Sequence, residues 1–127
     1  MLYVKESQRS PEEVGRALEA AAQKQQFGVL AVHNLRQSLA NKGVTLPFDC
    51  LVYEVCNPVQ AKKVLETDAS ISTVLPCRIS VYRQGSATKI ATFLPTALLN
   101  QFEAADLEPV AREVERAMEA MIDEAAG

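Results

Sequence analysis

The stretch FDCLVYEVCNPVQAKKVL, residues 48–65, decides the fold because it carries a strand directly into a helix. Apolar side chains alternate with polar ones up to Cys56, which predicts a strand that buries one face. Asn57 then supplies a helix cap, and Pro58 suits the first helical position. The sequence therefore predicts a helix from Pro58 to about Thr67, with a thiol placed immediately before its first turn.

The segments on either side predict further strands and helices in alternation. Ser10, followed by Pro11 and later Glu13, has the pattern of a capping box and predicts a helix start. Strands are expected at residues 2–6, 27–33, 77–83 and 88–94, a short helix at 34–41, an extended segment at 69–76 and a long amphipathic helix at about 106–125. This order predicts an α+β fold, in which helices pack on one face of a mostly antiparallel sheet.

Length and composition narrow the class of protein. With 127 residues, of which 48% are hydrophobic, the chain is expected to form a single domain over residues 1–127. No apolar run reaches the ~20 residues that span a bilayer, and the N-terminus lacks the pattern of a signal peptide. We therefore expect a cytoplasmic protein without a membrane partner. The net charge of -3, with basic residues scattered, argues against nucleic acid.

Several motifs together resemble the domain of unknown function 302 family (DUF302), in the branch where a CNP motif is followed by an LPC motif. The resemblance rests on the motifs FGVL at 27–30, VCNPVQAKKVLETD at 55–68 and VLPCRISVY at 74–82, and it covers about residues 1–100. It implies a fold like that of the TATA-box-binding protein and a homodimer. The resemblance brings no established activity with it. The chain departs from the family at His33 and at Leu94, where family members commonly carry acidic residues.

The CNP motif provides the candidate site. Unpaired backbone N–H groups and the positive end of the helix dipole lie at a helix N-terminus, so we expect the pKa of the Cys56 thiol to be lowered there. The residues expected to bind a ligand are Cys56, Asn57, Pro58, Lys62, Pro76 and Cys77, of which the two cysteines are also the candidate catalytic residues. Packing alone also explains a cysteine at this position, because free cysteines are often buried.

The position of Cys77 decides whether two thiols meet. If the strands that contain Cys56 and Cys77 run antiparallel, the two sulfur atoms come to the same end of the sheet, and a shared pocket is expected. Cys50 matches no family motif and is interpreted as a buried strand residue. A zinc site that adds His33 would still lack a fourth ligand, so no metal site is predicted.

Two functions from different classes remain. The first is a homodimeric binding domain that holds a small ligand or metal beside the paired thiols. The alternative is a thiol-dependent sulfur-transfer or redox protein, with Cys56 as nucleophile and Cys77 as its partner. The sequence leaves open whether the protein is an enzyme, and it identifies neither a cofactor nor a ligand.

Overall fold

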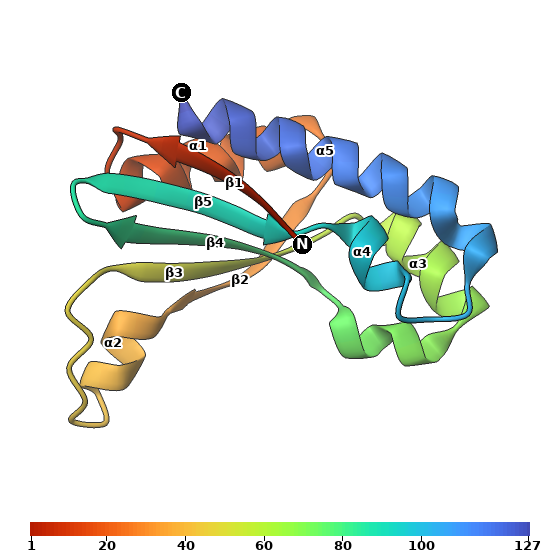
Figure 1. Cartoon of the computed structure of the whole chain (residues 1–127), viewed down its shortest axis with the longest axis horizontal. Helices are drawn as coiled ribbons and strands as arrows, with labels where there is room; N and C mark the ends of the chain where they lie inside the picture. The colour runs from red at the N-terminus through yellow and green to blue at the C-terminus, as the bar shows by residue number, and fades with distance from the viewer.

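The computed structural model describes residues 1–127, which form one antiparallel sheet with helices packed against it (Figure 1). The strands are β1 (Leu2–Ser7), β2 (Gly28–Asn34), β3 (Cys50–Cys56), β4 (Cys77–Gln84) and β5 (Ala87–Phe93). Their order across the sheet is β1-β5-β4-β3-β2, and every neighbouring pair is antiparallel. The α+β fold predicted from the sequence is confirmed.

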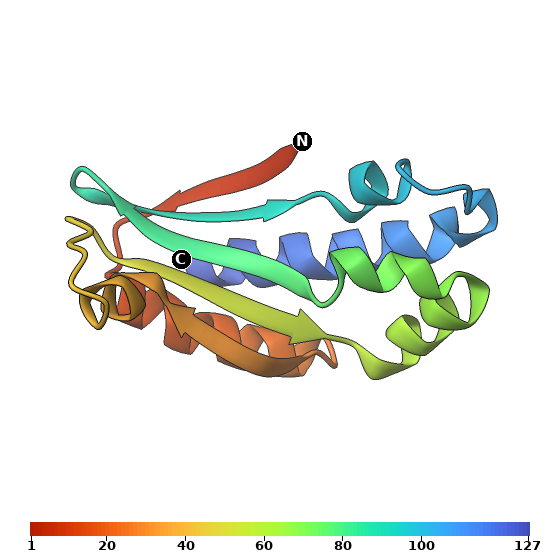
Figure 2. The same ribbon diagram turned by 90° about the horizontal axis from the view of Figure 1, so that it is seen from below.

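Two long helices, α1 (Pro11–Lys24) and α5 (Glu108–Ala126), cover one face of this sheet (Figures 1 and 2). They pack against each other as well as against the strands. The centre of the core is fully buried and apolar, and it includes Val14, Leu18, Val55, Ile79, Ile90 and Met121. Strand residues enter this core at every second position, because alternate side chains of a strand point to the same face.

Local sequence rules explain how α1 begins and how it fits the sheet. The Ser10 hydroxyl accepts a hydrogen bond from the Glu13 N–H at 3.2 Å, and the Glu13 carboxylate accepts one from the Ser10 N–H at 3.0 Å. The predicted capping box is therefore confirmed. Gly15 lets the helix approach the sheet, because a Cβ atom there would lie 2.0 Å from the Tyr53 hydroxyl oxygen.

The central strands β3 and β4 fix the position of the two motif cysteines. Val55 pairs with Cys77 in the antiparallel register, so the end of β3 lies beside the start of β4. A tight turn then joins β4 to β5, and Gly85 occupies it with a φ of 64°, in the left-handed region that favours glycine. The hairpin predicted for these two strands is confirmed.

A second group of elements lies beyond this end of the sheet (Figure 1). It consists of α3 (Pro58–Thr67), the 3₁₀ helices η1 (Ala69–Val74) and η2 (Ala105–Leu107), α4 (Pro95–Leu99) and the first half of α5. Ile71, Ala104 and Leu107 form a small core among these elements. The long helix α5 thus connects this group with the sheet.

The extended segment predicted at residues 69–76 is wrong, because residues 69–74 form η1. Asp68 stops α3 and starts the new turn, since its carboxylate accepts a hydrogen bond from the Ser70 N–H at 2.9 Å. Helix α4 was not predicted at all, whereas the short helix α2 (Leu35–Ala40) agrees with the prediction. None of the helices is both long enough and apolar enough to cross a bilayer.

Candidate functional site

A cavity of about 280 Å³ lies between the end of the sheet and the group formed by α3, η1, α4 and α5. Most of its lining residues are hydrophobic, and they come from segments far apart in the sequence. Val64 belongs to α3, Leu99 to α4 and Ala111 to α5, while Val55 contributes from the sheet. The cavity therefore exists only when both parts of the fold are assembled.

The strand–helix junction of the CNP motif forms one wall of this cavity. The Asn57 side-chain oxygen accepts hydrogen bonds from the N–H groups of Val59 at 3.1 Å and Gln60 at 3.2 Å, so it caps α3 as predicted. Both Cys56 and Asn57 line the cavity. Their position follows from the local sequence, because a strand that ends in a capped helix must turn at this point.

The antiparallel register brings the second motif cysteine to the same wall. Cys77 is the first residue of β4 and lines the cavity together with Pro76 and Cys56. Cys56 directly follows Val55, the register partner of Cys77, so the two cysteines lie on neighbouring strands at the same end of the sheet. The structure therefore brings together the sequence-predicted residues Cys56, Asn57, Pro76 and Cys77.

The expected activation of Cys56 is wrong in direction. Burial raises the pKa of the Cys56 thiol instead of lowering it. Burial, with a smaller contribution from Cys56, raises the pKa of Cys77 from 9.0 to about 11. Burial is the main cause of both shifts, because removal from water disfavours the charged thiolate. Burial therefore favours the protonated form of both thiols.

Two other predicted residues do not line the cavity. Lys62 lies on the solvent side of α3, where its ammonium group pairs with the Glu66 carboxylate at 3.1 Å. Pro58 is also exposed and acts as the first residue of the helix. A helix turns by 100° per residue, so only some positions after the junction can face inward. Lys62 and Pro58, which the sequence predicted as ligand-binding residues, therefore do not belong to this cavity.

The remaining candidates lie near the other end of β3. His33 pairs in register with Val52, and its ring contacts the Glu54 carboxylate at 2.9 Å. A zinc site shared by His33, Cys56 and Cys77 is contradicted by this register, and no group of three metal-ligating side chains gathers anywhere in the chain. Cys50 is partly exposed, not buried, because it faces the side of the sheet that no helix covers.

Gln60 is a site residue that the sequence reasoning missed. Its side chain lines the cavity, the residue is only 9% exposed, and its Oε1 is the one buried side-chain oxygen or nitrogen without a hydrogen-bond partner. A signal was present in the sequence, because Gln60 precedes Val64 by four residues and so shares its inward face of α3. The position of Gln60 on the inward face of α3 was therefore predictable from the sequence.

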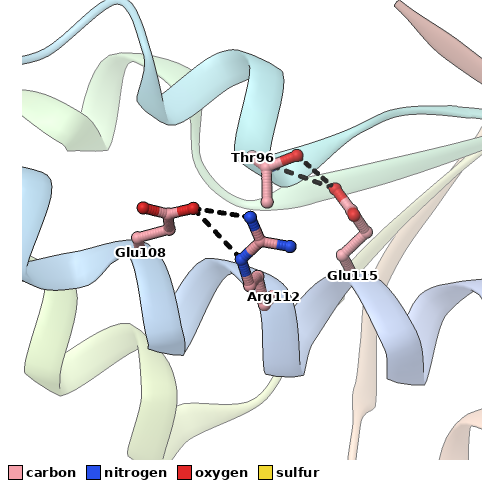
Figure 3. Close-up of polar contacts among 4 residues, drawn as sticks. All are labelled: Thr96, Glu108, Arg112 and Glu115. Atoms are coloured by element: carbon pink, nitrogen blue, oxygen red, sulfur yellow. Dashed lines mark hydrogen bonds and ion pairs between the residues drawn. The ribbon is translucent and has the colours of Figure 1, made fainter.

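Residues of helix α4 line part of the cavity. The N-terminus of this helix is held by the neighbouring helix α5 (Figure 3). The Glu115 carboxylate accepts hydrogen bonds from the Thr96 hydroxyl at 2.7 Å and from the Thr96 N–H at 3.1 Å. It thereby satisfies the N-terminus of α4, which has no cap of its own. One turn earlier along α5, Arg112 pairs with Glu108 at 2.7 Å on the exposed surface.

Comparisons with known proteins agree with this architecture. The family model described as "Domain of unknown function DUF302" matches residues 3–125, which include α5 as well as the motif region. A crystal structure of a conserved DUF302 protein from Bacillus stearothermophilus is similar over nearly the whole fold. Its TM-score is 0.93 at 28% sequence identity, and the match covers 98% of this chain and 97% of the other. No curated protein matches the sequence. The chain therefore belongs to the DUF302 family.

Proposed function

We propose that this protein is a binding domain that holds a small molecule in the cavity beside Cys56 and Cys77. The observation that carries the proposal is the cavity of about 280 Å³ with a nearly continuous apolar lining and a few polar groups on one wall. Small-molecule sites have this character, and the volume is close to the lower end of their usual range.

The state of the thiols favours binding over covalent chemistry. A nucleophilic or metal-binding cysteine acts as the thiolate, and the raised pKa values of Cys56 and Cys77 oppose that form. The thiol-dependent alternative has one observation in its favour, namely that both thiols line the same cavity. Because neither thiol is activated, we propose that they act as small polarisable wall groups for the ligand.

We propose in addition that the protein is a homodimer that associates through the sheet face opposite α1 and α5. Leu2, Val4 and Phe93 lie on this face and are 58%, 43% and 45% exposed. Charged residues of the same face pair internally, such as Lys89 with Glu6 at 3.1 Å, so a second copy would meet little repulsion. An exposed apolar patch of this kind is typical of an interface.

Binding in the cavity is tested by filling it. Ala111 is buried, lines the cavity and belongs to α5, so Ala111→Leu should occupy the space. Ala120 lies on the exposed face of the same helix, and Ala120→Leu is the matched control. We expect indene, an apolar bicyclic probe, to bind the wild type and the control in ligand-observed NMR, and to lose at least tenfold in affinity for Ala111→Leu. Equal binding to all three proteins, or no binding to any, would contradict the proposal.

Native mass spectrometry tests the dimer independently of the ligand. The wild type should give the mass of two chains, and Val4→Lys should give the mass of one, because a charge in an apolar interface is costly to desolvate. Val59→Lys is the control, since Val59 is 65% exposed on α3, away from the sheet face. A wild type that remains one chain at micromolar concentration would refute the homodimer.

A further inference from the structure

We infer that the cavity takes the apolar tail of a small amphiphile, a molecule with a hydrocarbon chain of about eight carbons and one polar end group. The tail lies inside the cavity, and the end group stays in water where the lining reaches the surface at Leu30. The inference rests on the proposed function and specifies the class and the orientation of the ligand. Three features support it: the chemistry of the lining, its exposed part, and the volume.

The lining offers few partners to a polar group. No lysine, arginine, aspartate or glutamate belongs to it, and side-chain oxygen and nitrogen atoms come only from Asn57, Gln60 and Ser72. The Asn57 carbonyl oxygen already accepts two hydrogen bonds at the start of α3, the Gln60 carbonyl oxygen is buried from water, and Ser72 is exposed. A charged group deep inside would lose its hydration without a counter-ion. A polar end group is therefore more stable in water, and an apolar tail is suited to the interior.

Part of the lining is open to solvent. Leu30, Leu65 and Ser72 are exposed although they line the cavity. Leu30 is 63% exposed and Leu65 is 38% exposed. The apolar lining therefore continues to the molecular surface at these residues, and an end group located there keeps its contact with water.

A bulge in β2 accompanies the exposed position of Leu30. Val29 pairs with Val55 and Ala31 pairs with Glu54, so Leu30 has no partner on β3. Bulges of this kind redirect a side chain from the regular alternation of a strand. At the edge of the sheet, Leu30 thus lines the cavity and meets the solvent at the same time.

The volume sets the length of the tail. An apolar cavity of ~150 Å³ is sufficient for benzene. The cavity of about 280 Å³ is nearly twice as large, so on the same scale it accommodates a chain of about eight carbons. The additional carbons of a longer chain would extend into solvent.

A series of alcohols tests the tail. Hexanol, octanol and decanol differ by two methylene groups at each step, and competition with indene in ligand-observed NMR reports binding in the cavity. We expect octanol to bind about tenfold more tightly than hexanol, because two more methylene groups are buried. Decanol should gain less than threefold over octanol, because its additional carbons lie outside. An equal gain at both steps would contradict the limit that the cavity sets.

The position of the end group is tested with octanol, octanoate and octyltrimethylammonium, which share one chain. If the end group stays in water, a charge on it costs little, so we expect the three affinities for the wild type to agree within about tenfold. The inference is overturned if either ion binds more than tenfold more weakly than octanol, because that loss indicates a buried end group.

Charges placed at residue 30 locate the end group. Leu30→Lys should favour octanoate and Leu30→Glu should favour octyltrimethylammonium, so the affinity ratio of the two ions should differ at least fivefold between these variants at low salt. Leu39→Lys and Leu39→Glu are the matched controls. Leu39 is 37% exposed on α2, at the other end of the sheet from α3, and it does not line the cavity (Figures 1 and 2). The inference fails if charges at residue 30 change the ratio no more than charges at residue 39.

The two failures have different signatures. If indene and the octyl probes all fail to bind, the proposed function fails. If indene and octanol compete for the cavity while the ions are rejected, or while charges at residue 30 have no effect of their own, only the inference about the amphiphile fails.

Discussion

The Cys77 thiol reports directly on the environment of the cavity wall. Its pKa is raised to about 11 by burial and by the neighbouring Cys56. We predict that iodoacetamide alkylates Cys77 in the native protein at a rate that rises with pH up to about 11, whereas the unfolded chain reacts like an ordinary thiol with a pKa of 9.0. Peptide mass spectrometry of the alkylated protein measures the rate for each cysteine.

Replacement of the neighbouring thiol tests whether the two sulfur atoms interact. Cys56→Ala removes the electrostatic contribution of Cys56, so the pKa of Cys77 should fall but stay above 9.0, because burial is the larger cause. The raised pKa also makes stability depend on pH. The contribution of Cys77 to the free energy of unfolding is complete at pH values below the pKa of the unfolded chain, and it is lost as the pH rises through the pKa of the folded protein. A pH profile for Cys77 that is unchanged in Cys56→Ala would show that the thiols are not close.

Single residues differ in how well the sequence predicted them. Asn57 as the cap of α3, and Ser10 with Glu13 as the capping box of α1, were correct because these interactions join residues two or three positions apart. The pKa of Cys56 was wrong in direction, because burial of its thiol is a property of the assembled fold. Cys56 lines a cavity together with residues of η1 and α4, two elements that the sequence did not predict.

At the level of elements, helix α4 depends on a contact made by a distant one. Glu115 of α5 accepts the two hydrogen bonds from Thr96, and α4 is only five residues long. Since short helices are marginal without tertiary contacts, we predict that Glu115→Ala lowers the free energy of unfolding by about 1–2 kcal/mol. Urea denaturation measures the loss, and hydrogen exchange should show faster exchange at the amides of residues 96–99.

A matched variant on α5 separates this effect from the removal of any acidic residue. Glu113 is exposed and makes no hydrogen bond or ion pair, so Glu113→Ala should stay within about 0.5 kcal/mol of the wild type. Because α4 borders the cavity, Glu115→Ala should also weaken the binding of indene. If both variants lose the same free energy of unfolding, the hydrogen bonds between Glu115 and Thr96 make no contribution of their own to stability.

Elements with a strong periodic pattern were predicted well. The five strands and α1, α3 and α5 agree with the structure to within a few residues, because alternation or helical spacing extends over each of them. Helix α4 and the 3₁₀ helix η1 were missed because each is too short to show a period, and α4 has no local cap. These two elements border the cavity, so the closure of the site was not visible in the sequence.

At the scale of the whole molecule, the long helix α5 runs along both the sheet and the second group of elements (Figures 1 and 2). Residues of both parts line the cavity. The sequence predicted that Cys56 and Cys77 would meet if their strands were antiparallel, and the register of Val55 with Cys77 satisfies that condition. It did not predict that the meeting point borders a largely apolar cavity. Its apolar lining includes Val64, Leu99 and Ala111, which lie on three different helices and far apart in the sequence. No local sequence pattern links these three residues.

The most direct test of the account is a crystal structure of the protein soaked with indole. We predict that indole lies inside the cavity, in contact with the wall that Cys56 and Cys77 form. The account is contradicted if the side chains around Gln60 repack to fill the space, or if indole binds only at the surface.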